Sequence, residues 1–144
     1  MEKARVLFVC IHNSARSQMA EAFLNRLGGD RYAAQSAGIE PGIINPVVVT
    51  AMKEIGYDLS GNTTQGVFAL LKKGERFGYV FTVCDEANGE RCPLFPGSGN
   101  KIHWGFPDPS ALTGSPEEIL AGTRVIRDMI KAKIEAFVAA GKAE

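Results

Sequence analysis

A cysteine and an arginine near the start of the chain, Cys10 and Arg16, enclose five residues directly after the apolar run 6–9. That run is typical of a buried strand in a parallel sheet, and the residues after Arg16 have the spacing of a helix. A loop between a strand and a helix N-terminus binds anions, because unpaired backbone N–H groups and the helix dipole point into it. With a thiolate at one end and a guanidinium at the other, this loop can bind a tetrahedral dianion and attack its central atom.

Cys10 is the predicted nucleophile, and only its thiolate form attacks. The loop N–H groups, the helix dipole, the charge of Arg16 and a hydrogen bond from Ser17 would all favour the anion. Arg16 also offers a planar fork that matches two oxygens of a tetrahedral oxyanion. The alternative is a buried strand-end cysteine beside a solvated arginine. The predicted oxyanion-binding loop consists of Ile11, His12, Asn13, Ser14, Ala15 and Ser17.

Asp108, which is followed by Pro109, is the predicted general acid. Its carboxyl group would protonate the leaving oxygen while the sulfur bonds to the central atom. The neighbouring aromatic residues Trp104 and Phe106 would lower the local dielectric. An Asp-Pro pair alone is an ordinary turn signal, so this assignment depends on the Cys10 loop.

Two further cysteines, Cys84 and Cys92, distinguish a thiol relay from hydrolysis. A phosphatase needs one cysteine, whereas here a second thiol follows another predicted strand and a third comes eight residues later. Cys84 would attack Cys10 and expel a reduced product, and Cys92 would then attack the resulting Cys10–Cys84 disulfide at Cys84. The alternative is a pair of unreactive cysteines, one in the core and one in a loop.

Strand and helix signals alternate along the chain and predict one α/β domain over residues 1–144, a three-layer sandwich around a mainly parallel sheet. The predicted strands are 5–10, 32–36, 79–83 and 101–104, and the predicted helices are 17–27, 46–56, 65–73 and one that starts at the cap Ser115. Ligands of open α/β sheets bind beyond the carboxyl ends of the strands. We therefore expect Cys10, Ser36, Cys84 and Asp108 at one edge of the sheet.

Composition excludes several classes of partner. The chain has 16 basic and 16 acidic residues and no basic block, which argues against nucleic acid and anionic membranes. No apolar stretch approaches the roughly 20 residues of a membrane span, and the start of the chain lacks a full signal-peptide core, so we expect a soluble cytoplasmic protein. Three cysteines without a Cys-x-x-Cys pair, with two histidines, argue against a disulfide framework and a zinc site.

These motifs together resemble the low-molecular-weight protein tyrosine phosphatase superfamily and, within it, the thioredoxin-coupled arsenate reductases. The loop motif is specific to the superfamily, whereas the Cys84/Cys92 pair and the His-Trp-x-Phe run point to the reductase branch. The matching residues are 9–22 around the loop, Ser36-Ala37-Gly38, Val83-Cys84-Asp85, Cys92-Pro93, His103-Trp104-Gly105-Phe106 and Asp108-Pro109.

The resemblance implies a low-molecular-weight phosphatase-like fold with a four-stranded parallel sheet. It implies that arsenate is reduced to arsenite, with Cys10 as nucleophile, Arg16 and the loop backbone as oxyanion binders, and Asp108 as acid. It also implies that Cys84 releases arsenite and that thioredoxin reduces a final Cys84–Cys92 disulfide. No organic cofactor is implied.

Some relatives bind a potassium ion beside the loop through an aspartate and residues that match Asn13, Glu21 and Ser36. Gln65 takes the place of that aspartate here. The loss of an anionic oxygen ligand weakens the case for a cation, so we predict no metal site.

Two other functions are compatible with parts of the pattern. A phosphotyrosine phosphatase with extra protective cysteines would use the same loop and the same acid. A non-catalytic oxyanion or redox sensor would bind arsenate or phosphate without turnover. The role of Cys84 and Cys92 discriminates between these functions and the relay.

Overall fold

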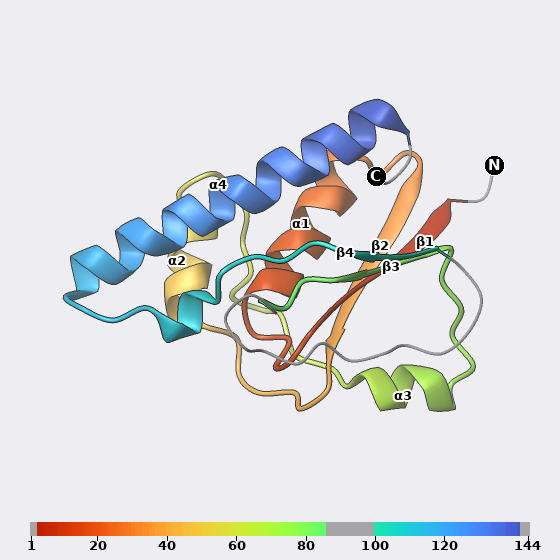
Figure 1. The fold of residues 1–144 in the computed structure, drawn as a ribbon, viewed down its shortest axis with the longest axis horizontal. Helices are drawn as coiled ribbons and strands as arrows, with labels where there is room; N and C mark the ends of the chain where they lie inside the picture. Colours follow the sequence, from red (N-terminus) through yellow and green to blue (C-terminus); the bar gives the residue numbers. More distant parts are fainter. Residues whose placement is uncertain (1–2, 86–99, 142–144) are drawn as a thin grey trace.

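The computed structural model describes residues 3–85 and 100–141. In this part of the chain four parallel strands form one sheet in the order β2-β1-β3-β4 (Figure 1). The strands are β1 (Ala4–Cys10), β2 (Tyr32–Gly38), β3 (Tyr79–Thr82) and β4 (Asn100–His103). The helices are α1 (Arg16–Leu27), α2 (Pro46–Lys53), α3 (Val67–Lys72) and α4 (Pro116–Ala140), with a 3-10 turn at Pro109–Ala111. The predicted α/β fold with a four-stranded parallel sheet is confirmed.

The sheet is the middle of three layers, because side chains of β1 alternate between its two faces. Phe8 and Cys10 belong to the larger apolar core, which α1, α2 and α4 cover (Figure 1). Leu7 and Val9 belong to the smaller core, which α3 covers on the opposite face. Both faces of β1 are thus buried, as its unbroken apolar run predicts.

The carboxyl end of β2 differs from the prediction. Ser36 pairs with Phe8 inside the strand, and the pairing continues until Gly38 lies opposite Cys10. Ala37 and Gly38 extend the strand although they carry almost no apolar signal. Ser36 therefore lies two residues before the strand end, while Gly38 lies beside Cys10.

The starts of α2 and α4 agree with their predicted caps, whereas the end of α2 differs from the prediction. The Asn45 side chain accepts from the N–H groups of Val47 and Val48 at the start of α2, and Ser115 and Glu118 form a capping box at the start of α4. α2 ends at Lys53 rather than near Gly56. Within the described residues, no helix is long and apolar enough to span a membrane.

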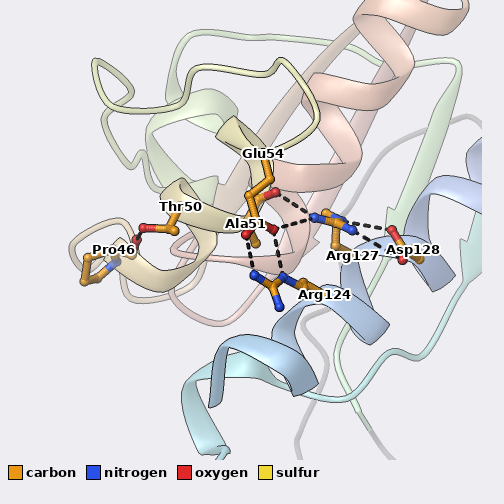
Figure 2. A network of polar contacts seen from close by, with 7 residues as sticks. All are labelled: Pro46, Thr50, Ala51, Glu54, Arg124, Arg127 and Asp128. Carbon is orange, nitrogen blue, oxygen red and sulfur yellow. Dashed lines mark hydrogen bonds and ion pairs between the residues drawn. The ribbon is translucent and has the colours of Figure 1, made fainter. Parts of the chain in front are cut away.

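An ion-pair network joins the C-terminal end of α2 to α4 (Figure 2). Arg124 donates to Glu54 Oε1 from Nε at 2.9 Å, and Arg127 donates to the same oxygen at 3.2 Å and to the Ala51 carbonyl at 2.8 Å. The hydrogen bond from Arg124 is the largest cause that lowers the pKa of Glu54 below its usual value. The network fixes α2, whose N-terminus lies near the Cys10 loop.

Candidate functional site

Cys10 is the last residue of β1, and its thiol is surrounded by hydrogen-bond donors. Its side chain is only 2% exposed. The Asn13 backbone N–H donates to Cys10 Sγ at 3.1 Å, and Ser17 Oγ lies 2.9 Å from the same sulfur. Two short contacts to one sulfur are an arrangement that suits a thiolate, which accepts several hydrogen bonds.

The direction of the Ser17 hydrogen bond follows from its other partner. Gln65 donates its backbone N–H to Asn13 Oδ1 at 3.0 Å, which fixes the orientation of the Asn13 amide. Asn13 Nδ2 therefore donates to Ser17 Oγ at 2.8 Å. Because that oxygen accepts a hydrogen bond from Asn13 Nδ2, the Ser17 hydroxyl can donate its own proton to Cys10 Sγ.

Asn13 is the only non-glycine residue with a positive φ, 55°, among those the structure describes. Asparagine adopts this left-handed conformation more readily than most residues. Gly38 lies directly beside the turn, since a Cβ atom there would come within 2.6 Å of the Ile11 carbonyl oxygen and 2.8 Å of the Asn13 nitrogen. The loop geometry thus depends on a glycine in β2.

The segment after β2 holds the outer side of the Cys10 loop. The Ile11 carbonyl accepts from the Glu40 N–H at 2.8 Å, the His12 carbonyl from Gly42 at 3.0 Å, and the Ser14 carbonyl from Asn45 at 2.8 Å. In each of these trans peptide units the N–H group points opposite to the carbonyl group. Because the carbonyl groups point outward, these N–H groups point toward the inside of the loop. The Asn13 N–H at Cys10 Sγ is one of them. His12 Nδ1 lies 3.0 Å from the Glu40 carbonyl, so this exposed histidine braces the loop.

Arg16 begins α1 and connects the loop to the segment after β4. It is 3% exposed, and its Nη1 donates to the Phe106 carbonyl at 3.1 Å. Its Nη2 lies 3.7 Å from Asp108 Oδ2. Asp108 also accepts from the Ser110 N–H at 2.9 Å and so caps the turn Pro109–Ala111. The structure therefore brings the predicted acid to the predicted oxyanion-binding arginine.

Cys84 is a fully buried thiol beyond the end of β3. β3 is the direct neighbour of β1, and the Val83 N–H continues their ladder by donating to the Val9 carbonyl at 3.0 Å. Cys84 and Cys10 belong to the same apolar core. Cys92 and most of the loop predicted after Cys84 lie outside the described residues.

A polar cavity of about 350 Å³ lies behind the loop, between α1, β2 and residues 61–65. Ser36 Oγ donates to Glu21 Oε1 at 2.8 Å, and burial raises the pKa of Glu21 above its usual value. Gln65 Nε2 donates to the Ser36 carbonyl at 2.8 Å, and the backbone N–H of Gln65 donates to Asn13 Oδ1. Two oxygens beside this cavity, Asn13 Oδ1 and the Ser36 carbonyl, thus accept N–H groups of Gln65.

Sequence reasoning missed several groups that support the site. Gln18 is 2% exposed and bonds to both the Cys10 loop and residues 62–63. The Phe106 carbonyl and the N–H groups of residues 40–45 are backbone partners, which no side-chain pattern signals. Gln18 had a detectable signal, because a polar residue on the buried side of a helix needs partners.

Known proteins that resemble the chain show its family. Residues 5–144 match the low molecular weight phosphotyrosine protein phosphatase family. The chain belongs to this family. It is 41% identical over 143 residues to the arsenate reductase of Halalkalibacterium halodurans, with 99% of this chain and 100% of that one covered. The family resemblance inferred from the sequence is confirmed.

Solved structures of family members agree with the fold. The arsenate reductase of Archaeoglobus fulgidus superposes with a TM-score of 0.76 at 28% identity, over 93% of this chain and 98% of that one. The thioredoxin-dependent arsenate reductase of Corynebacterium glutamicum superposes with a TM-score of 0.60 at 26% identity, over 93% of this chain and 63% of that one. The reductase branch of the family is therefore favoured over the phosphatases.

Proposed function

We propose that this chain reduces arsenate to arsenite through a relay of Cys10, Cys84 and Cys92, and that thioredoxin regenerates it. The observation that carries the proposal is a second buried thiol, Cys84, two residues beyond the end of β3, the strand adjacent to the one that ends at Cys10. The reductase names of the relatives described above support the substrate. Thiol chemistry of this kind suits a reducing compartment, and we propose the cytoplasm.

In the first step the Cys10 thiolate attacks the arsenic atom of arsenate. The Arg16 guanidinium and the inward N–H groups of residues 11–17 hold the oxygens, since charge-assisted donors stabilise an oxyanion most strongly. Asp108 protonates the oxygen that leaves as water. The result is a Cys10–arsenic(V) adduct.

In the second step Cys84 attacks the Cys10 sulfur. The sulfur–arsenic bond breaks, and its electron pair stays on arsenic, which leaves as arsenite. Two thiols have become one disulfide, and arsenic has gained the two electrons. The register pairs Val9 with Thr82, which places Val83 beside Cys10. The Val83 N–H donates to the Val9 carbonyl and both cysteines belong to one apolar core, so Cys84 follows Val83 near the end of β1.

In the third step Cys92 attacks Cys84 and releases Cys10 as a thiolate. The resulting Cys84–Cys92 disulfide is the form that thioredoxin reduces by the same exchange chemistry. This step prepares Cys10 for another arsenate and uses no cofactor besides the thioredoxin dithiol.

The Cys84→Ser variant tests the relay. It lacks the thiol that attacks Cys10, so we expect no arsenite release, while weak hydrolysis of an aryl phosphate survives because Cys10, Arg16 and Asp108 remain. Cys92→Ser is the matched control, and it should release one arsenite per molecule and then stop. Multiple turnovers by Cys84→Ser with thioredoxin as the only reductant would refute the relay.

A further inference from the structure

The turn at Asn13 directs its donors at Cys10, so whatever holds this turn also sets the state of the thiol. The Asn13 N–H donates a hydrogen bond directly to Cys10 Sγ. Asn13 Nδ2 donates to Ser17 Oγ, so the Ser17 hydroxyl can donate its proton to the same sulfur. Asn13 makes both contacts from the left-handed conformation with φ of 55°. Although asparagine adopts this conformation more readily than most residues, it is still less favourable than a negative φ, so contacts with the surroundings help to hold it.

Gln18 supplies that fixation from inside α1. Its Nε2 donates to the Asn13 carbonyl at 3.1 Å and to the Thr63 carbonyl at 3.1 Å. Its Oε1 accepts from Asn62 Nδ2 at 3.0 Å. Because carbonyl oxygens only accept, the orientation of the Gln18 amide is determined, and both of its N–H groups and its oxygen have partners. One buried side chain thus joins α1, the Cys10 loop and residues 62–63.

We propose that Gln18 is a positioning residue, whose amide clamps Asn13 and thereby keeps Cys10 as a reactive thiolate. It donates to the carbonyl of the same residue whose N–H donates to Cys10 Sγ, so its effect passes through Asn13. The inference rests on the proposed function only in taking Cys10 as the reacting thiol.

The test is the pH profile of Cys10 alkylation by iodoacetamide in the fully reduced protein, resolved by peptide mass spectrometry. Gln18→Met keeps the length of the side chain and removes its donors. We expect its profile to move to higher pH, with alkylation at neutral pH slowed roughly fivefold, the loss of about one net hydrogen bond. Gln35→Met is the matched control, a half-buried glutamine on β2 that should leave the profile unchanged.

A merely structural role for Gln18 would lower the melting temperature and leave the profile of the folded protein in place, which would overturn the proposal. Should Gln18→Met fail to fold, Gln18→Asn keeps a neutral amide that is one methylene too short to reach both carbonyls. It should shift the profile in the same direction, and an unshifted profile in Gln18→Asn also overturns the proposal.

This experiment contains no arsenate, so it separates the two hypotheses. A shifted profile in a protein that does not reduce arsenate would support the clamp and refute only the proposed function. An unshifted profile in an active reductase would do the reverse.

Discussion

The reactivity of Cys10 depends on a few hydrogen bonds whose directions can be worked out atom by atom. Its sulfur faces a backbone N–H and a serine hydroxyl, and the hydroxyl is oriented because Asn13 donates to its oxygen. A hydrogen bond to a charged group contributes about 1.5–3 kcal/mol, more than one between neutral groups. The Asn13 N–H and the Ser17 hydroxyl are therefore two donors that reach the Cys10 sulfur.

Ser17→Ala removes the hydroxyl donor to Cys10. We expect the first step, measured as arsenate-dependent loss of the Cys10 thiol in a single turnover, to slow by roughly 10- to 100-fold, the rate equivalent of one charge-assisted hydrogen bond. Ser60→Ala, in an exposed turn where the serine bonds to Asp58, is the control and should react at the wild-type rate. An unchanged rate in Ser17→Ala would show that this hydroxyl does not activate the sulfur.

Glu21 should make stability fall as the pH rises. Burial raises its pKa above the usual 4.5, although the hydrogen bond from Ser36 opposes the shift. The folded state therefore prefers the protonated carboxyl, and stability is lost as pH rises from 4.5 through the raised value. Glu21→Gln stays neutral and still offers Ser36 an acceptor, so its melting temperature should exceed that of the wild type at neutral pH. The two should converge below pH 4.5, and a constant gap would contradict the assignment.

At the scale of elements, the site forms where segments distant in sequence meet at one sheet edge. β1 ends at Cys10, β3 leads to Cys84, and the segment after β4 brings Asp108 to Arg16. The end of β2 contributes Gly38, whose missing side chain leaves room for the Cys10 loop. Parallel pairing aligns these strand ends, so the sheet sets the spacing between reactive groups.

Gly38→Ala should therefore damage the site without a change in any reactive group. Its Cβ would come within 3.0 Å of backbone atoms of Ile11, His12 and Asn13, which cannot move without a shift of the loop. We expect arsenate turnover to fall by roughly 100-fold, as for small misplacements of reacting groups. Gly42→Ala is the control, because its Cβ would meet His12 Cβ at an ordinary 3.7 Å. Equal turnover by the two variants would refute the dependence on close approach.

The α2–α4 network should stabilise the protein only above acid pH. The pKa of Glu54 is lowered, first by its hydrogen bond with Arg124, so its contribution is present above the usual 4.5 and is lost as pH falls through the folded value. Glu54→Gln should melt at a lower temperature than the wild type at neutral pH, and the gap should close in acid. Glu135→Gln, exposed on α4, should show neither effect.

At the scale of the whole molecule, the features predicted well are those with long apolar signals or strong caps. β1 and β3 contain the apolar runs 6–9 and 79–81, and Ser115 with Glu118 forms the expected capping box. The end of β2 was missed because Ala37 and Gly38 extend a strand by backbone pairing alone. The sequence predicts that a helix begins at Gln65, whereas α3 begins at Val67. The backbone N–H of Gln65 donates to Asn13 in the Cys10 loop, and its side chain donates to the Ser36 carbonyl in β2.

The residues proposed to react were easier to predict from the sequence than the groups that hold them in position. Cys10, Arg16 and Asp108 have residue types that match their proposed roles, and the structure brings Asp108 to Arg16. Gln18 and the Phe106 carbonyl act through contacts between distant segments, which only the fold brings together. The topology of the whole molecule thus determines which polar groups form hydrogen bonds with the residues of the site.

The most direct test of the central claim is a count of thiols. Fully reduced protein is mixed with stoichiometric arsenate and no reductant, and the thiols are then alkylated and weighed by mass spectrometry. The chain has three cysteines, and the relay predicts that one thiol remains, with a Cys84–Cys92 bridge and one arsenite released. Three remaining thiols, with arsenate unchanged, would contradict the relay and leave a phosphatase as the function to test next.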